Sequence, residues 1–370
     1  MRALVIDLNN FSRYPTLPVG LLVAVLRSSG IEVDVLSPLA RGVQGYPRLT
    51  RARPWGLIDS RLRYWSAVSP SQTVRALRAF AARAVHPGTS DDRDVIIGYA
   101  RELLHRNAID VVLVSAYTMY ENITAGIANL CQSGGVPLLV GGSYLVAAPI
   151  VERWLSIEGI TGIFSGEPEC DLAALVQAAA RGDDISGFPG VSVPGRPPAT
   201  PAPPLAALDR LPFADYSDFP WEKYPNRIVP IMTGRGCEWG RCRFCADVVT
   251  AAGRTFRSRS LVNVLDEIRH QSARHATSLF VFLDLKLNSD LDIWRGMISE
   301  SKSSPGVISG SHQTDHPSAS IAATSGATSA LSCREYETKM SAKHAPGSTA
   351  TDLSISARTG LPNPWHMGLF

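Results

Sequence analysis

The stretch PLLVGGSYLVAAPIVERWLSIEGITGIFSGEPE, residues 137–169, contains two short apolar runs separated by a helical pattern. The runs PLLVGG (137–142) and ITGIFSG (160–166) have the length and hydrophobicity of strands that are buried on both faces. Residues 147–155 between them show the apolar spacing of a helix. Because parallel strands need a crossover of this kind, the stretch predicts a βαβ unit.

The same alternation extends over most of the first 180 residues. Further strands are expected at 2–8, 32–37 and 111–116, and helices at 19–29, 94–105, 121–133 and 169–180. This pattern predicts an α/β fold: a doubly wound, Rossmann-like parallel sheet with right-handed crossovers, spanning residues 1–185. Residues 40–90 interrupt the alternation with many arginines and several aromatic residues, and we interpret them as an insertion.

A proline-rich segment follows the first domain. Seven prolines fall within residues 189–204. Proline fixes φ and removes a backbone donor, so residues 186–226 are expected to form an extended linker. Residues 227–300 then resume the alternation, with a helix predicted to start at the N-cap Ser260.

The pattern ends after residue 300. Residues 301–370 contain fourteen serines and only thirteen large apolar or aromatic residues. Such a segment buries too little apolar surface to offset its chain entropy, so a tail of low order, or an aberrant sequence appended to the domain, is expected. A divergent but ordered C-terminal half is the alternative.

Three cysteines gather in the segment TGRGCEWGRCRFCAD, residues 233–247. Cys237, Cys242 and Cys245 have the spacing C-x4-C-x2-C directly after a predicted strand. Three thiolates suit a [4Fe-4S] cluster with one open iron. The arginines of the segment would offset the cluster's negative charge; they are Arg235, Arg241 and Arg243.

Two other interpretations of the cysteines stay open. A structural zinc site would need a fourth ligand, and the candidates lack zinc-like spacing. These candidates are Cys170, Cys333, His270 and His275. Chance clustering of unliganded thiols is the third interpretation.

The cysteine segment resembles the cluster loop of radical S-adenosylmethionine (SAM) enzymes, in which the usual spacing is C-x3-C-x2-C with an aromatic residue before the last cysteine. Phe244 fills the aromatic position. The resemblance implies a (β/α) barrel domain, here partial, in which the cysteines hold three irons and the fourth iron chelates SAM for cleavage to a 5′-deoxyadenosyl radical. It also implies that Phe244 lies near the adenine and that Asp284 contacts the amino group of SAM. A carboxylate satisfied by a neighbouring backbone N–H is the alternative for Asp284.

Polar or glycine-rich residues follow three predicted strands of the first domain, at 115–122, 141–146 and 165–169. Ligands of open α/β sheets bind at these carboxyl ends. No G-x-G-x-x-G follows the first strand, which argues against a nicotinamide cofactor.

The order of GG, helix, strand and GEPE in residues 138–176 resembles the cobalamin-binding domain that precedes the barrel in one class of radical SAM enzymes. The resemblance implies cobalamin contacts from these strand ends; the candidate residues are Ser115, Tyr117, Thr118, Gly141, Gly142, Ser143, Gly166 and Glu167. The D-x-H-x-x-G motif, which supplies a histidine to cobalt in other cobalamin proteins, is absent. Tyr117, Thr118 and Met119 would then lie near the lower face of the cobalamin, with ordinary loop packing as the alternative.

Together the resemblances imply a cobalamin-dependent radical SAM enzyme, with SAM, cobalamin and a [4Fe-4S] cluster as cofactors. The expected reaction is methylation, or a related radical-mediated transformation, of a natural-product or peptide substrate, with a flavodoxin or ferredoxin as electron donor. An incomplete barrel would leave the chain inactive as written. A non-catalytic cobalamin-binding or iron–sulfur protein is the alternative.

Composition excludes other classes of function. The net charge of +3 argues against a nucleic-acid binder, which needs a concentrated basic face. No apolar run reaches the about 18 residues that a membrane span requires. The first residues carry Asp7 where a signal peptide would be apolar, so a cytoplasmic location is expected.

Overall fold

Five parallel strands and one antiparallel edge strand form the first sheet. They are β1 (Arg2–Asp7), β2 (Glu32–Leu36), β3 (Val111–Ser115), β4 (Leu138–Gly141), β5 (Gly162–Phe164) and β6 (Val191–Ser192). Their spatial order is β2-β1-β3-β4-β5-β6, with β6 antiparallel to β5. The structure is a computed structural model, and it describes residues 1–9, 13–43, 71, 73–74, 89–242, 256–286, 289–303, 309–311 and 320–321.

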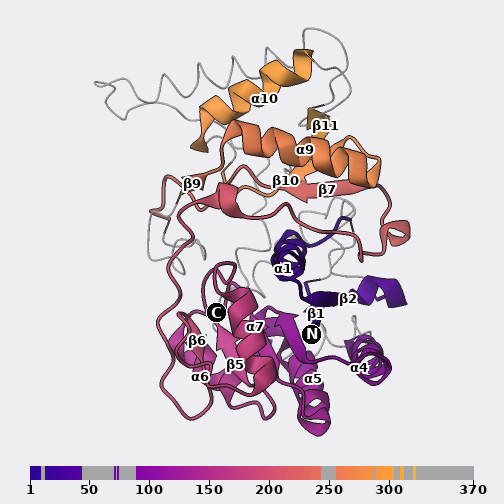
Figure 1. Cartoon of the computed structure of the whole chain (residues 1–370), viewed down its shortest axis with the longest axis vertical. Coiled ribbons are helices and arrows are strands. Elements are labelled where there is room, and N and C mark those ends of the chain that lie inside the picture. Colours follow the sequence, from indigo (N-terminus) through magenta and orange to yellow (C-terminus); the bar gives the residue numbers. More distant parts are fainter. Residues whose placement is uncertain are drawn as a thin grey trace.

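Helices cover both faces of this sheet (Figure 1). They are α1 (Leu17–Ser28), α4 (Thr89–Arg106), α5 (Glu121–Gly134), α6 (Ala148–Leu155) and α7 (Leu172–Arg181), with short 3-10 turns η1 (Pro38–Arg41) and η2 (Thr118–Tyr120). Successive residues of β1 face opposite hydrophobic clusters: Val5 joins a cluster with α1 and α7, whereas Leu4 joins a cluster with α4, α5 and α6. The predicted doubly wound parallel sheet is therefore confirmed.

The second sheet contains three parallel strands and one antiparallel strand among the described residues. In spatial order they are β12 (Ser320–Ile321), β11 (Ser309–Ser311), β10 (Leu279–Phe282) and β7 (Ile228–Ile231). The helices between the parallel strands are α9 (Leu261–His275) and α10 (Leu291–Ser303), and η3 (Leu208–Arg210) and η4 (Trp221–Lys223) precede β7. The Ser260 hydroxyl accepts a hydrogen bond from the Asn263 amide at 3.2 Å, which confirms the predicted N-cap of α9.

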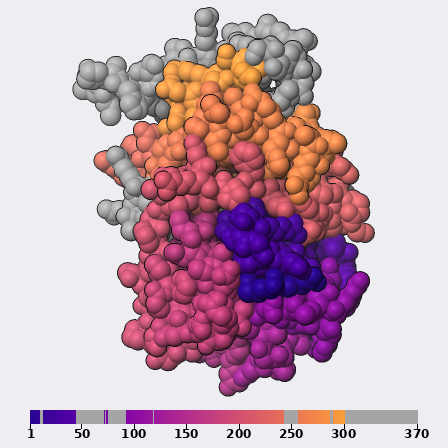
Figure 2. Space-filling view, in the orientation of Figure 1, coloured from indigo at the N-terminus to yellow at the C-terminus, as the bar shows by residue number. Residues whose placement is uncertain are grey.

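Helix α1 lies between the two sheets. Figure 2 shows this N-terminal segment, in indigo, between the first domain and the orange second domain. At Gly20 a Cβ atom would lie 2.4 Å from the Tyr216 ring, and the Gly20 carbonyl accepts a hydrogen bond from the Asp215 amide at 2.9 Å. Although α1 is largely apolar, neither it nor any other helix among the described residues is long and apolar enough to cross a membrane.

The proline-rich segment is more closely associated with the first sheet than an extended linker would be. Strand β6 lies within it and pairs with β5, beyond the expected domain boundary at residue 185. The Ala202 amide also donates to the Ser165 carbonyl at 2.8 Å. The sequence did not reveal β6 because a two-residue strand next to prolines has no readable period.

Part of the C-terminal segment joins the second sheet. Strand β11 pairs in parallel with β10, and β12 pairs with β11, within the region for which the sequence predicts low order. The rest of residues 301–370 beyond α10, and most of the insertion expected at 40–90, lie outside the described residues. The sequence did not predict β11, because its residues Ser-Gly-Ser show no apolar pattern.

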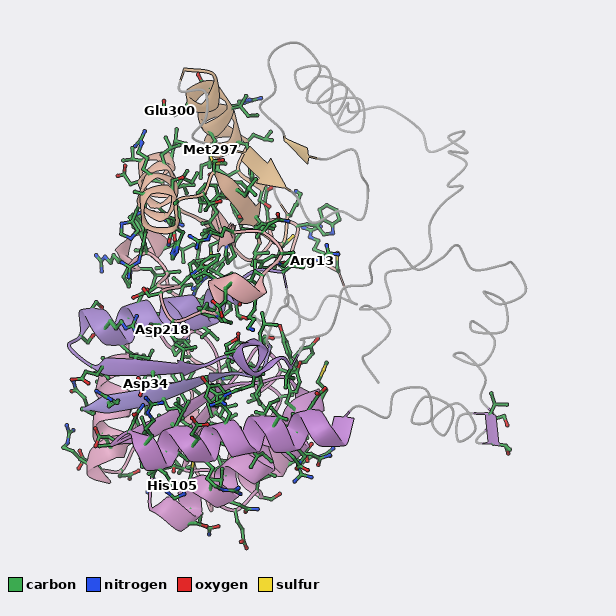
Figure 3. All side chains as sticks on the ribbon, turned by 90° about the vertical axis from the view of Figure 1, so that its right-hand side faces the viewer. Arg13, Asp34, His105, Asp218, Met297 and Glu300 are labelled. Atoms are coloured by element: carbon green, nitrogen blue, oxygen red, sulfur yellow. The ribbon has the colours of Figure 1, made fainter. Side chains whose placement is uncertain are left out.

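A charged network links α1 to α9. Arg27 Nη1 is 2.8 Å from Asp215 Oδ2 and Arg27 Nη2 is 2.5 Å from Asp218 Oδ2, while Arg274 Nη2 is 3.2 Å from Asp215 Oδ1. Figure 3 shows Asp218 in the region where the first domain meets the second. Burial opposes the ionisation of Asp215, but hydrogen bonds from Ser217 and Arg27 lower its pKa to about 2. Burial raises the pKa of the neighbouring Asp218.

Replacing Asp215 by Asn should lower the free energy of unfolding at pH 7 by about 1–2 kcal/mol, because Arg27 and Arg274 lose their shared carboxylate. The pKa of Asp215 is below its ordinary 3.8, so its stabilisation is complete above about pH 4 and is lost as the pH falls toward about 2. Urea unfolding of the parent and of D215N should therefore converge over that window. The matched variant D218N should cost less at pH 7, because burial already disfavours the Asp218 carboxylate. Equal losses from both variants at every pH would contradict this account.

Candidate functional site

The cysteine loop leaves the second sheet through a two-stranded ribbon. Strand β8 (Gly234–Arg235) pairs antiparallel with β9 (Arg257–Ser258), so the loop begins and ends at the same place. Cys237 and Cys242 lie in the described part of the loop, both half-buried and neither in a disulfide. The third predicted ligand, Cys245, and the aromatic Phe244 fall outside the described residues.

Glycine determines the backbone around Cys237. Gly236 and Gly240 have φ values of 81° and 52°, in the left-handed region that residues with a side chain rarely adopt. The indole of Trp239 is 56% exposed, and the Arg241 guanidinium lies 5.8 Å from its ring centroid. The glycines therefore set how this turn presents its thiol.

The described residues do not complete a metal site by themselves. No group of three His, Cys, Asp or Glu side chains among them is arranged to hold a metal ion. His270 and His275, two candidates for a fourth zinc ligand, lie against the aromatic rings of Phe213 and Trp221. Burial lowers the pKa of His275 to about 4, so it is neutral in this aromatic cluster. The two described thiols nevertheless have the donor chemistry that an iron–sulfur cluster uses.

Asp284 secures the first residues of the cysteine loop. Its Oδ1 accepts hydrogen bonds from the Thr233 amide at 3.0 Å, the Thr233 hydroxyl at 2.6 Å and the Gly234 amide at 2.8 Å. Burial raises the pKa of Asp284, although these hydrogen bonds favour the carboxylate. The contacts correspond to the alternative in which the carboxylate is satisfied by neighbouring backbone, and contact with SAM stays a prediction.

The carboxyl ends of β1 and β3 form the point where the strand order of the first sheet reverses. Asp7 is aligned with Ser115 across these strands, and Asn9 Nδ2 donates to Ser115 Oγ at 3.1 Å. Asn9 Oδ1 is buried and has no hydrogen-bond partner among the described residues. An orphaned acceptor at a topological switch point fits a ligand that carries a hydrogen-bond donor.

The glycine pair at the end of β4 has a structural explanation at its second position, Gly142. A Cβ atom at Gly142 would lie 2.0 Å from the Ala116 carbonyl oxygen, whereas one at Gly141 would make ordinary contact, 3.7 Å from the Phe164 carbonyl oxygen. The close approach at Gly142 is thus made by the protein's own backbone. Ser143, which follows, is exposed.

The loop after β3 packs against the loop after β4. The Tyr117 ring meets the Tyr144 ring edge-on at 5.3 Å between centroids. Thr118 begins the 3-10 turn η2, and Met119 is 53% exposed. The ring contact is compatible with loop packing, and contact of Tyr117 and Thr118 with cobalamin stays a prediction.

The GEPE segment connects the two sheets. A Cβ atom at Gly166 would lie 2.7 Å from the Ala202 carbonyl oxygen, so this glycine faces the proline-rich segment. Glu167 Oε1 accepts from Arg257 Nη2 at 2.7 Å, and Glu167 Oε2 lies 3.2 Å from Arg235 Nη1. Burial opposes ionisation of Glu167, but the hydrogen bond from Arg257 and the charge of Arg235 lower its pKa.

Glu169 completes this network, which we call the GEPE clamp: Glu167, Glu169, Arg235 and Arg257. Arg235 Nη2 donates to Glu169 Oε1 at 2.5 Å. Sequence reasoning proposed that Arg235 offsets a cluster's charge, but in the structure its guanidinium is paired with carboxylates. Sequence reasoning missed the roles of Glu169 and Arg257. The signal for them in the sequence is that acidic residues follow β5 and that arginines flank the cysteine loop.

A buried ion pair between Arg259 and Glu267, which sequence reasoning also missed, lies next to the ribbon of the cysteine loop. Arg259 Nη1 donates to Glu267 Oε2 and, at 2.9 Å, to the Met232 carbonyl at the end of β7. The two charged side chains are only 5% and 3% exposed. Removing either partner would leave an uncompensated buried charge beneath the ribbon.

Comparison with known proteins gives the fold a counterpart. The chain superposes on the radical SAM methyltransferase TsrM from Kitasatospora setae, solved with tryptophan substrate and a SAM analogue, with a TM-score of 0.54, 17% identity and coverage of 82% of this chain. The TsrM structure with cobalamin and a [4Fe-4S] cluster gives a TM-score of 0.53 and 16% identity. The expected α/β fold, a Rossmann-like parallel sheet followed by a partial (β/α) domain, is therefore confirmed at the level of fold.

Sequence comparison gives one curated relative. An uncharacterized methyltransferase from Pyrococcus horikoshii is 26% identical over an alignment of 183 residues, and the match covers 47% of this chain and 39% of that protein. The chain covers about half of the TsrM chain, 52%. No family model matches the sequence.

Gly142→Ala should lower the free energy of unfolding by about 2–4 kcal/mol, because the new Cβ would overlap a backbone carbonyl that cannot move without β3. Gly141→Ala is the matched control and should change the free energy of unfolding by less than about 1 kcal/mol. Urea unfolding followed by circular dichroism measures both. Similar stabilities for the two variants would show that the contact between Gly142 and Ala116 is not tight in solution.

Proposed function

We propose that the chain is a cobalamin-dependent radical SAM methyltransferase that acts on a natural-product or peptide substrate. The observation that carries the proposal is the contact between the two candidate halves of the site. Glu167 follows β5 of the first sheet, and Arg235 precedes Cys237 in the cysteine loop, yet their side chains are 3.2 Å apart. The segment after β5 and the ribbon that carries the cysteine loop are thus in direct contact.

The candidate residues have the chemistry that the cofactors require. Cys237, Cys242 and Cys245 would hold the [4Fe-4S] cluster, and Asp284 keeps the loop's first amides in position. The strand ends around Asn9 and Ser115 would receive cobalamin, with Asn9 Oδ1 available to a donor. When bound, the cluster supplies an electron to SAM and cobalamin carries the methyl group.

A non-catalytic cobalamin-binding or iron–sulfur protein is the second candidate. The described part of the second sheet has three parallel strands, β7, β10 and β11, and an incomplete barrel would favour this candidate. Anaerobic incubation with SAM, cobalamin and a strong reductant separates the two. Formation of 5′-deoxyadenosine or S-adenosylhomocysteine supports the enzyme, whereas cobalamin binding without cleavage or demethylation of SAM supports the binding protein.

Anaerobic reconstitution should load the chain with about four irons and four sulfides, because three thiolates suit this cluster. Cys237→Ala, Cys242→Ala or Cys245→Ala should each abolish loading. Cys131→Ala and Cys170→Ala are the controls: the Cys131 thiol is fully buried, which raises its pKa to about 12, and Cys170 is exposed outside the loop. Iron, sulfide and zinc analysis measures the outcome, and stoichiometric zinc without iron would overturn the proposal.

A further inference from the structure

The GEPE clamp holds both ends of the cysteine loop from the other domain. Arg235 belongs to β8, through which the chain enters the loop, and Arg257 belongs to β9, through which it returns. Glu167 binds both guanidinium groups, and Glu169 binds the first. A loop whose two ends are fixed by one carboxylate cannot shift relative to that carboxylate without breaking a charged contact.

The acidic side of the clamp is itself rigid. The Ser165 amide donates to the Gly190 carbonyl at 2.8 Å, and the Ser165 hydroxyl donates to the Leu145 carbonyl. Glu167 Oε2 also accepts from the Leu205 amide at 2.8 Å. Because the segment that carries the carboxylates is tied to β6, to the loop after β4 and to the proline-rich segment, it forms a fixed reference for the ribbon.

The clamp is largely shielded from water and electrically balanced. The Arg235 and Arg257 side chains are 16% and 15% exposed, and those of Glu167 and Glu169 are 23% and 7% exposed. Two positive and two negative charges leave no net charge, and bidentate contacts fix orientation as well as distance. Loss of the Glu167 charge would remove the carboxylate that two poorly hydrated guanidinium groups share.

We propose that Glu167 and Glu169 are positioning residues that hold the cysteine loop at the carboxyl edge of the first sheet. The clamp thereby sets the distance between the ligands of the two domains. Asp284 anchors the loop's first amides from within the second sheet, and the clamp anchors it from the first. The proposal rests on the proposed function for what the loop holds, but the clamp's effect on the loop is measurable without any cofactor.

The test uses the metal-free full chain under native, reducing conditions, with iodoacetamide as the probe and peptide mass spectrometry as the readout. In Glu167→Gln the alkylation rates of Cys237 and Cys242 should rise about tenfold, because local opening of the loop becomes easier. Glu169→Gln should act in the same direction. The rate at the fully buried Cys131, which reports global unfolding, should not change.

Two further variants complete the test. Glu300→Gln, which removes an exposed ion pair with Arg269, should leave the loop thiols as slow as in the parent. Combining Glu167→Gln with Arg257→Gln should accelerate alkylation by less than the product of the single effects, because both changes break the same ion pair. Unchanged loop rates in Glu167→Gln, or a parallel rise at Cys131, would overturn the clamp. Absence of iron from the reconstituted parent would overturn the proposed function alone.

Discussion

Helix α1 is buried against two sheets at once, and this double burial fixes how the domains lie. Its backbone approaches the segment before β7 so closely that Gly20 leaves no room for a Cβ atom beside Tyr216. The Tyr216 hydroxyl in turn donates to the Pro230 carbonyl of β7 at 2.7 Å. A helix that is apolar nearly all round is stable only in such a setting, so α1 and the second sheet depend on each other.

This packing brings the carboxyl ends of the two sheets to the same side of the molecule. The GEPE segment after β5 and the ribbon after β7 then meet through complementary charges rather than through an apolar contact. Charged groups suit this position because their hydrogen bonds fix the orientation of the two segments. They also keep the contact polar, which is compatible with polar ligands. The orphaned acceptor of Asn9 follows β1 of the first sheet, and Cys237 follows the ribbon strand β8.

Sequence reasoning recovered what local patterns encode. The strand and helix alternation, the Ser260 cap and the position of the cysteine loop each depend on residues that are near one another in the chain, so their periodicity or chemistry is visible. Strands β6 and β11 were invisible because two or three residues without apolar spacing are ordered by a neighbouring strand. The partners of Glu167 were also unreadable, because Arg235 and Arg257 are distant in sequence and meet it only after both sheets have formed.

The tight contact at Gly20 has a consequence for how such chains diversify. A larger residue at this position would be tolerated only with a smaller residue in place of Tyr216, so the two positions are expected to change together in descendants of this sequence. The first domain therefore cannot be exchanged as an independent module for that of a relative with a larger residue at the Gly20 position. Recombination across this family of architectures would succeed where the helix and the tyrosine that covers it are inherited from the same parent.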